Sequence, residues 1–215
     1  MNVQVSIPNQ GNIRVELFNQ VLQFLLASQQ HYSLSLFLNE ARPTDLNMNR
    51  ICQKAIERDQ DWILTIDSDT IPLTNPIPLI ALAKEDTGVI ACPYPILQHQ
   101  APAGAPLQWS VFIKKGNKFA ALPLSYKPSS PIESITHTGA GCLLINAKML
   151  KTIEPPWFEY QWNKSTFEMN LGHDLYFCEK VLAAGFRILC AWQYPCDHIR
   201  VAKYSQITGP LCQVQ

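Results

Sequence analysis

The sequence has 215 residues, of which 47% are hydrophobic, and its formal net charge is zero. This length and composition are typical of one globular domain with a core of its own. The neutral charge excludes a broad basic surface for nucleic acid, although a local basic patch stays open.

Targeting signals are not evident. Residues 1–8 contain no basic segment followed by a long apolar one, which argues against a signal peptide or membrane anchor. The apolar runs are far shorter than the roughly 20 residues that a membrane helix needs. The seven cysteines form no C-x-x-C pair, and several lie in apolar segments, so we expect reduced, mostly buried thiols. These features predict a cytoplasmic protein without a membrane span.

The first half alternates predicted strands and helices. Expected strands cover residues 3–7, 33–38, 62–66 and 88–92, and expected helices cover residues 14–28, 47–58 and 77–84. Asn47 or Asn49 is expected near the start of the second helix. This alternation predicts an α/β fold with a mainly parallel sheet.

The second half begins with a proline-rich segment, residues 93–131, for which we expect a small antiparallel excursion with a hairpin turn at residues 114–118. Further elements are expected as a strand at 142–145 after a small-residue turn, a helix beginning at 147–152, a helix over 173–184 and a strand over 186–191. Residues 195–198 are expected to end the ordered part, and the tail after about residue 204 to be loosely held or docked on the surface.

The most informative motif is Asp67-Ser68-Asp69, which closes the apolar run at residues 62–66. A buried strand that ends in two carboxylates brings negative charge to the carboxyl edge of a sheet, where open α/β folds bind ligands. Close carboxylates repel each other unless a cation joins them. Mg²⁺ and Mn²⁺ take such oxygen ligands and bridge to phosphates. A plain surface loop is the alternative, since Asp and Ser also form turns.

Six segments together resemble the GT-A class of nucleotide-sugar glycosyltransferases, and within it the family-2-like inverting enzymes. They are residues 5–9, the helix with Asn49 and Arg50, and residues 63–69, 139–145, 172–178 and 197–199. The resemblance runs from Val3 to about His198. It implies a Rossmann-like GT-A fold in a single catalytic domain, residues 1–215, with a nucleotide-binding half at about 1–92, an acceptor half at about 93–200 and a tail at 201–215.

The resemblance also implies a metal site. In similar enzymes the second Asp of the motif and a late His bind the metal, which corresponds to Asp69 and His198 here, while Asp67 assists the metal or faces the ribose. The cation would neutralise the departing diphosphate as a Lewis acid. Because imidazole suits softer ions than Mg²⁺, Mn²⁺ is favoured over Mg²⁺. An ordinary surface histidine is the alternative for His198.

Asp174 resembles the general base of the family. It lies at the start of a predicted helix, where the helix dipole stabilises a carboxylate, although Asp is also a common capping residue there. The family pattern is Glu-Asp, whereas this chain has His173-Asp174. The aspartate is retained and the preceding acid is replaced, so acceptor contacts are expected to differ and His173 to assist.

The nucleotide-binding edge corresponds to Pro8, Asn9, Asn49, Arg50 and Ser68. Asn9 is expected to bond the base and Arg50 to meet a phosphate or a carboxylate. The alternatives are a turn asparagine and a solvated helix charge.

Sugar or acceptor contacts are expected from Gly139, Gly141 and Trp157. The glycines let backbone approach a ligand closely, or simply form a tight turn. Trp157 and Phe158 are expected either to stack on a sugar ring or to form a hydrophobic lid over the core.

The implied function is metal-dependent, inverting transfer of a sugar from a nucleoside diphosphate sugar, with UDP favoured, to an acceptor hydroxyl. A glycan, a protein or a modified nucleic-acid base is open as the acceptor. Two alternatives stay open. One is a sugar-nucleotide or carbohydrate-binding protein of the same fold without catalysis. The other is a haloacid-dehalogenase-like phosphatase, whose D-x-D also follows an apolar strand; that motif opens the chain and continues with Thr where this chain has Ile71.

Overall fold

A seven-stranded sheet forms the centre of the computed structural model, which describes residues 1–97, 107–116 and 118–199. Its order is β2 (Ser33–Glu40), β1 (Asn2–Asn9), β3 (Trp62–Ile66), β11 (Cys142–Asn146), β5 (Thr87–Ala91), β14 (Arg187–Ala191) and β9 (Ile132–Ile135). The neighbours β2, β1 and β3 are parallel, and so are β5 and β14, while β11 and β9 run against their neighbours. The mostly parallel α/β sheet predicted from the sequence is confirmed.

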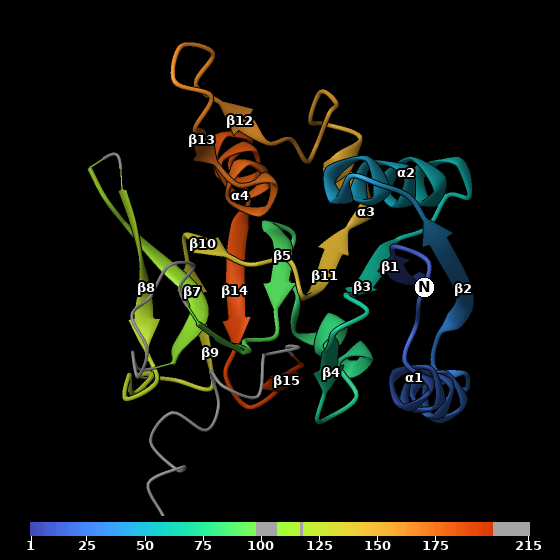
Figure 1. Ribbon diagram of the computed structural model, residues 1–215. Coiled ribbons are helices and arrows are strands. Elements are labelled where there is room, and N and C mark those ends of the chain that lie inside the picture. The colour runs from blue at the N-terminus through green and yellow to red at the C-terminus, as the bar shows by residue number, and fades with distance from the viewer. Residues whose placement is uncertain (98–106, 117, 200–215) are drawn as a thin grey trace, which may run out of the picture.

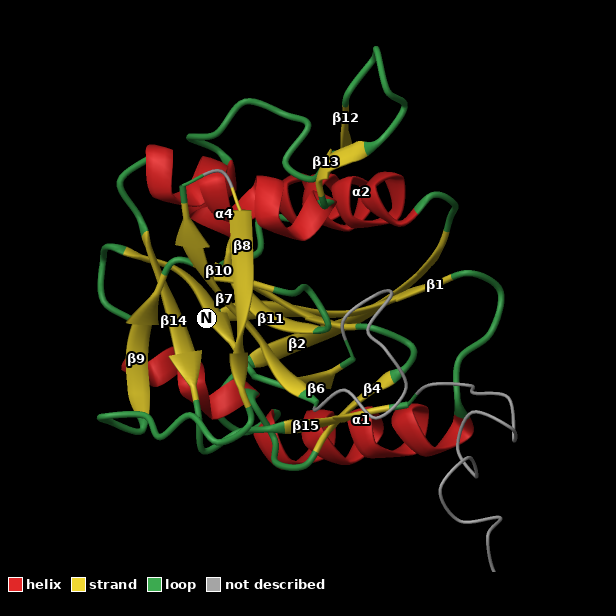
Figure 2. Cartoon of the chain, turned by 60° about the vertical axis from the view of Figure 1, so that its left-hand side comes forward, coloured by secondary structure: helices red, strands yellow, loops and turns green. Residues whose placement is uncertain are grey.

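Helices cover both faces of this sheet (Figures 1 and 2). One face carries α2 (Thr44–Glu57), α3 (Ala147–Leu150) and α4 (His173–Ala183), and the other carries α1 (Val15–Ser28) and the 3₁₀ helix η1 (Ile77–Leu82). Successive strand residues point to opposite faces, so Ile63 packs toward α2 whereas Leu64 and Ile66 pack toward α1. This is why the run at 62–66 is apolar throughout rather than alternating.

Three smaller sheets surround the central one. The predicted antiparallel excursion is present as β6 (Pro95–Ile96), β7 (Gln108–Lys115), β8 (Lys118–Pro123) and β10 (His137–Thr138). A hairpin joins β12 (Gln161–Trp162) to β13 (Met169–Leu171), and β4 (Thr70–Pro72) pairs with β15 (Cys196–His198). The sequence analysis did not predict either of the last two pairings, because strands of two or three residues show no periodicity.

Some predicted boundaries were wrong. Helix α2 begins at Thr44, directly after Pro43, so Asn47 and Asn49 lie inside it rather than at its start. The segment predicted as a helix over 77–84 is a 3₁₀ helix that ends at Leu82; Pro76 and Pro78 carry no N–H group for a regular helical ladder. The predicted tail beyond residue 199 lies outside the described residues.

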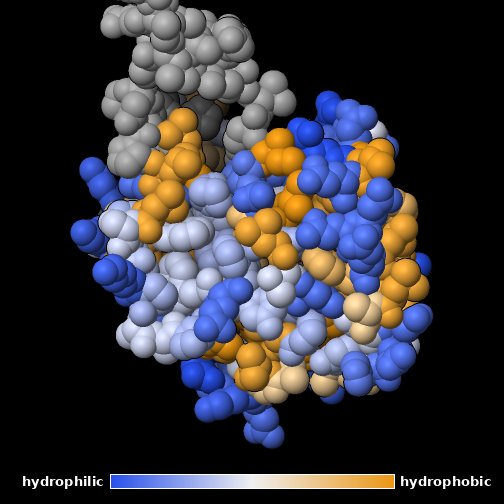
Figure 3. All heavy atoms as spheres, turned by 90° about the horizontal axis from the view of Figure 1, so that it is seen from below, coloured by the Kyte–Doolittle hydropathy of each residue, from blue (hydrophilic) through white to orange (hydrophobic). Residues whose placement is uncertain are grey.

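The two predicted halves of the chain interleave in the sheet, since β11 lies between β3 and β5. All six cysteines in the described part are free and buried, as expected, and Cys212 lies outside it. Among the described residues no helix is both long and apolar enough to cross a membrane. Helix α1 exposes Val15, Leu22 and Leu26, and the face seen from below mixes hydrophobic and hydrophilic residues (Figure 3).

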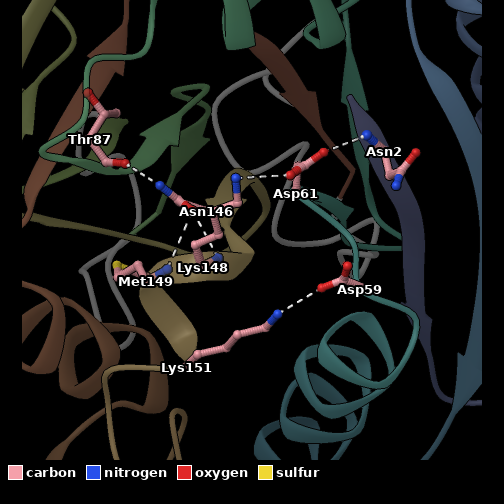
Figure 4. Close-up of polar contacts among 8 residues, drawn as sticks. All are labelled: Asn2, Asp59, Asp61, Thr87, Asn146, Lys148, Met149 and Lys151. Carbon is pink, nitrogen blue, oxygen red and sulfur yellow. Dashed lines mark hydrogen bonds and ion pairs between the residues drawn. The ribbon is translucent and has the colours of Figure 1, made fainter.

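Charged and polar side chains tie together the sheet edge where β1 and β3 begin (Figure 4). Asp61 accepts a hydrogen bond from the backbone N–H of Asn2 at 2.8 Å and pairs with Lys148 at 3.3 Å. The Asn146 side chain caps α3 and donates to the carbonyl of Thr87 at 3.2 Å. The opposite edge of the sheet, where β1 and β3 end, is built differently.

Candidate active site

A cleft of about 620 Å³ opens at the carboxyl ends of β1 and β3. Seven residues singled out from the sequence line it: Pro8, Asn9, Asp67, Ser68, Asp69, His173 and His198. Seven others complete the lining: Gln10, Asn12, Arg42, Thr44, Asn47, Tyr94 and Tyr160. The cleft therefore gathers segments from both halves of the chain.

The D-x-D motif forms the turn between β3 and β4. The backbone N–H of Asp67 donates to the Gly141 carbonyl at 2.8 Å, and the N–H of Thr70 donates back to the Asp67 carbonyl at 3.0 Å. The Asp69 carbonyl accepts from the N–H of Ile199 at 2.8 Å. These bonds fix the motif between β11 and the end of β15.

Pairing of β15 with β4 brings His198 to the D-x-D motif, because His198 lies opposite Thr70 in the register. The His198 side chain is only 5% exposed, and its Nε2 lies 3.5 Å from Oδ2 of Asp69. Its Nδ1 lies 3.0 Å from the carbonyl oxygen of Pro95. A carbonyl only accepts, so Nδ1 carries a proton and Nε2 is the atom available to a cation or to a second proton.

This pair fits a divalent cation. Two ligands about 2.1 Å from one ion, at angles of roughly 90° to 109°, lie about 3.0 to 3.4 Å apart, close to the observed separation. A backbone carbonyl that holds the other ring nitrogen is also typical of metal-binding histidines. No group of three or more His, Cys, Asp or Glu side chains within the described ranges is arranged to hold a metal. Asp69 and His198 are thus the two side chains that this pair offers to a cation.

Tyr94 forms the floor of the cleft beside this pair. Its ring makes an edge contact with His198, with centroids 4.8 Å apart, and its hydroxyl accepts a hydrogen bond from the N–H of Gly141 at 3.2 Å. Burial raises the pKa of the phenol well above its usual value, and nearby carboxylates add to the shift. Tyr94 is thus a neutral hydrogen-bonding group at neutral pH.

Gly139 and Gly141 make room for Tyr94. A Cβ atom at Gly139 would lie 2.3 Å from the Tyr94 hydroxyl, and one at Gly141 would lie 2.6 Å from the Tyr94 ring. Neither glycine belongs to the lining described above. The structure therefore supports the tight-turn interpretation of this segment, with backbone that packs closely against an aromatic side chain.

His173 and Asp174 begin α4, with Gly172 as the N-cap. Oδ1 of Asp174 accepts from the N–H of Leu175 at 2.8 Å, and the Asp174 charge lies near enough to raise the pKa of Tyr94. His173 lines the cleft, and burial lowers the pKa of its imidazole. His173 thus lies in the cleft lining, whereas Asp174, in the first turn of α4, is not among the lining residues.

An asparagine network shapes the edge of the cleft near β1 and β2. The amide of Asn47 donates to the carbonyls of Asn9 and Asn39 at 3.0 and 3.1 Å. The amide of Asn9 donates to the Asn39 carbonyl at 3.0 Å and its oxygen accepts from the N–H of Gly11 at 3.0 Å. Asn9 therefore holds the loop after β1 in place at the rim.

Asn49, Arg50 and Trp157 lie outside the cleft lining. The Asn49 amide oxygen accepts from the N–H groups of Trp157 and Phe158 at 2.8 and 3.1 Å, so it anchors the loop after α3. Trp157 is 4% exposed, and its indole N–H bonds to the carbonyls of Leu150 and Ile153, which favours the hydrophobic-lid interpretation. Arg50 is exposed on α2.

Arg42 and Tyr160 are two of the cleft residues that sequence reasoning missed. Arg42 lies just beyond the carboxyl end of β2, and its guanidinium donates to the Gln10 carbonyl at 2.8 Å. A cation directly after a parallel strand is a signal that the sequence contains. The sequence gives no such signal for Tyr160, because nothing in the sequence distinguishes it from the nearby aromatic residues Trp157 and Phe158, which are buried.

Comparison of the sequence with protein families finds no match, and comparison with curated proteins finds no relative. Among solved structures, A197 from STIV is similar to this chain at 17% identity and a TM-score of 0.60, over 94% of this chain and 87% of that one. A glycosyltransferase involved in the glycosylation of the major capsid of PBCV-1 is 13% identical with a TM-score of 0.49, over 99% of each chain. UDP-glucose pyrophosphorylase complexed with UDP-glucose is 7% identical with a TM-score of 0.47, over 91% and 92% of the two chains.

The likeness to A197 shows a shared fold. The mostly parallel seven-stranded sheet, the helices on both its faces and the small antiparallel sheets beside it agree with the fold class expected from the sequence. The chain has an α/β architecture consistent with a Rossmann-like GT-A fold.

Proposed function

We propose that this protein is a metal-dependent glycosyltransferase that moves a sugar from a nucleoside diphosphate sugar, with UDP as the favoured nucleotide, to an acceptor hydroxyl. One observation carries the proposal. Oδ2 of Asp69 and Nε2 of His198 lie 3.5 Å apart in a polar cleft at the carboxyl edge of a parallel sheet, which suits a cation that binds together with a diphosphate.

The donor occupies the cleft with its nucleoside toward the asparagine network and its diphosphate toward Asp69. Arg42 supports this orientation, because a guanidinium at the rim offers paired donors to phosphate oxygens. Arg42 thus takes the role that the sequence analysis assigned to Arg50. Asp67 and Ser68 contribute hydrogen bonds to the ribose or to the hydration of the site.

Asp69 and His198 would hold the metal, whose chemistry is to neutralise the charge that develops on the leaving diphosphate. The carbonyl of Pro95 orients His198 so that Nε2 faces the cleft. Tyr94, neutral and buried beneath the pair, excludes water from the floor of the cleft and keeps the imidazole ring in place.

The chemical step is a direct displacement with inversion at the anomeric carbon. The acceptor hydroxyl oxygen forms a bond to that carbon as the bond to the diphosphate oxygen breaks, and the electron pair leaves with the diphosphate. Asp174 takes the hydroxyl proton as general base. Two observations support this role: Asp174 directly follows the cleft residue His173, and its charge raises the pKa of Tyr94, which also lines the cleft.

A binding screen followed by a product assay tests the proposal. The melting temperature is measured with UDP-, GDP-, CMP- and dTDP-sugars, each with and without Mn²⁺, because a ligand that binds only the folded state raises it. The nucleotide sugar that gives the largest shift is then incubated with the protein, and nucleotide release is measured before and after addition of EDTA.

We expect one nucleotide sugar to stabilise the protein in the presence of Mn²⁺ and nucleotide release to stop on chelation. Stabilisation without release, with any acceptor tried, would instead support a binding protein without catalysis. Release of inorganic phosphate from a phosphomonoester, with no response to nucleotide sugars, would support the phosphatase alternative and overturn the proposal.

A further inference from the structure

The β12–β13 hairpin places apolar side chains in solvent beside the cleft. Trp162 is 57% exposed, Phe167 is 83% exposed and Met169 is 53% exposed. Trp162 and Phe167 are the two exposed side chains among the tryptophans and phenylalanines of the described part of the chain. Figures 1 and 2 show the hairpin projecting beyond the layer formed by α2 and α4.

The hairpin is a defined surface. Its strands pair Trp162 with Met169, so the two side chains are cross-strand neighbours. At the tip, Asn163 accepts at its side-chain oxygen from the N–H groups of Ser165 and Thr166 and at its carbonyl from the N–H of Phe167 at 2.8 Å. Phe167 is held at a φ of +56°, which a phenylalanine rarely adopts without such support.

The residues that flank the hairpin on both sides line the cleft. Tyr160 immediately precedes β12 and His173 follows β13, and both line the cleft. Their rings meet edge to face with centroids 4.8 Å apart, and the Tyr160 ring lies 6.5 Å from that of Trp162. A series of aromatic rings therefore runs from the cleft, past the start of α4, to the outer surface of the hairpin.

The charge and composition of the hairpin favour a neutral, hydroxyl-rich ligand. Residues 159–171 contain two glutamates and one lysine, which does not match the basic surface that anionic lipids or nucleic-acid strands require. Exposed aromatic rings on a surface of low net charge suit a sugar, whose C–H face packs on an aromatic ring.

We propose that Trp162 and its neighbours on this hairpin form an acceptor subsite, and that the acceptor is a saccharide chain. Trp162 stacks on a sugar unit remote from the reacting one, and Tyr160 guides the chain into the cleft, where its terminal hydroxyl meets the donor. This inference rests on the proposed function, and it narrows the acceptor from glycan, protein or nucleic-acid base to a glycan. It also replaces Trp157, which is buried, with Trp162 as the stacking residue.

Saccharide binding to the full chain is the test, measured by saturation-transfer difference NMR. The probes are cellobiose, maltose, lactose, chitobiose and the tetrasaccharide of each series, without any nucleotide. We expect at least one series to bind the wild type, the tetrasaccharide more tightly than the disaccharide. Trp162→Ala should weaken that binding by about tenfold or more, the loss typical of a stacked tryptophan, and Trp162→Tyr should restore most of it.

The matched control is Leu26→Ala, which removes an apolar side chain that is 64% exposed on α1. It should bind saccharide as the wild type does. Equal binding by Trp162→Ala and the wild type, or no binding by the wild type to any probe, would overturn the inference. Two other results would also overturn it, because each would assign the hairpin to another occupant. One is that the wild type and Leu26→Ala self-associate while Trp162→Ala does not. The other is that the wild type and Leu26→Ala co-sediment with phosphatidylcholine vesicles while Trp162→Ala does not.

Nucleotide affinity, measured on the same variants with UDP and Mn²⁺, separates this inference from the proposed function. If saccharide binding depends on Trp162 but no nucleotide binds, the hairpin is a saccharide-binding surface and is not an acceptor subsite. Nucleotide binding without saccharide binding would refute the inference and leave the proposed function intact.

Discussion

The two ends of strand β3 carry aspartates in opposite situations. Asp61, just before the strand, is held by the N–H of Asn2 and by Lys148. Asp69, just after it, lies beside His198 and Tyr94 in a cleft lined mainly by polar groups. The edge where β3 begins pairs its carboxylates with lysines, which serves stability, whereas the edge where β3 ends gathers carboxylates and histidines around an open space, which suits a charged ligand.

The largest effect should come from Asp174→Asn. Loss of a general base typically lowers the rate by about 10² to 10⁴-fold, so transfer should almost cease while nucleotide binding stays near that of the wild type. Initial rates at saturating donor, together with UDP affinity, check this. A variant that keeps more than a tenth of the wild-type rate would remove Asp174 from the mechanism.

Arg42→Gln tests whether the cleft edge near β2 holds the diphosphate. A charge-assisted contact to phosphate is worth about 1.5 to 3 kcal/mol, or roughly ten- to a hundredfold in affinity. We expect a weaker affinity for UDP by that factor. The control is Arg50→Gln on the exposed face of α2, for which isothermal titration should give the wild-type affinity for UDP. Weaker UDP binding in Arg50→Gln, with wild-type affinity in Arg42→Gln, would favour the original assignment to Arg50.

Gly139→Ala tests the packing that supports the floor of the cleft. The added methyl group would lie 2.3 Å from the Tyr94 hydroxyl, so the folded state should lose about 1 to 3 kcal/mol, as in other overpacked sites. In a Tyr94→Phe background the clash is relieved, and the double variant should be less destabilised than the sum of the two single variants. Urea unfolding measures all four proteins, and strict additivity would contradict the close contact.

Asp61→Asn is the smallest change and concerns the opposite edge. The hydrogen bond from the Asn2 N–H lowers the pKa of Asp61 below its usual value of 3.8. The ionised Asp61 carboxylate therefore stabilises the folded state fully above pH 3.8, and this stabilisation is lost as the pH falls through the lowered pKa. At neutral pH the variant should lose less than about 1 kcal/mol, with no change in transfer rate, and its deficit should shrink below about pH 4. A deficit that stays constant with pH would exclude this electrostatic origin.

Local sequence patterns predicted the position of the cleft at the sheet edge better than the contacts between the residues inside it. The apolar run before Asp67 and the alternation of elements identified the sheet edge at which the cleft lies, because strand and helix periodicities are local properties. The contact between His198 and Asp69 depends on the pairing of β15 with β4, two short strands far apart in the sequence. The resemblance to a family supplied that partnership, and nothing in the residues around His198 would have done so.

The residues that sequence reasoning misplaced share one cause. Asn49 and Trp157 have the polarity and shape of ligand-binding residues, yet they bond to each other and to neighbouring backbone groups. Side-chain type alone does not distinguish a group that binds a ligand from one that fastens a loop. Tyr94 and Tyr160 illustrate the converse, because their place in the cleft follows from the packing of Gly141 and His173 against them.

The most direct test of the account is whether Mn²⁺ increases the affinity for UDP, and through which residues. Isothermal titration is done with and without Mn²⁺ on the wild type, Asp69→Asn, His198→Ala and the control Asp197→Asn, whose residue lines a separate groove beside α1. We predict that Mn²⁺ raises the affinity about tenfold or more in the wild type and in Asp197→Asn, and has little effect in the other two. An equal gain in all four proteins, or no gain in the wild type, would contradict a cation held between Asp69 and His198.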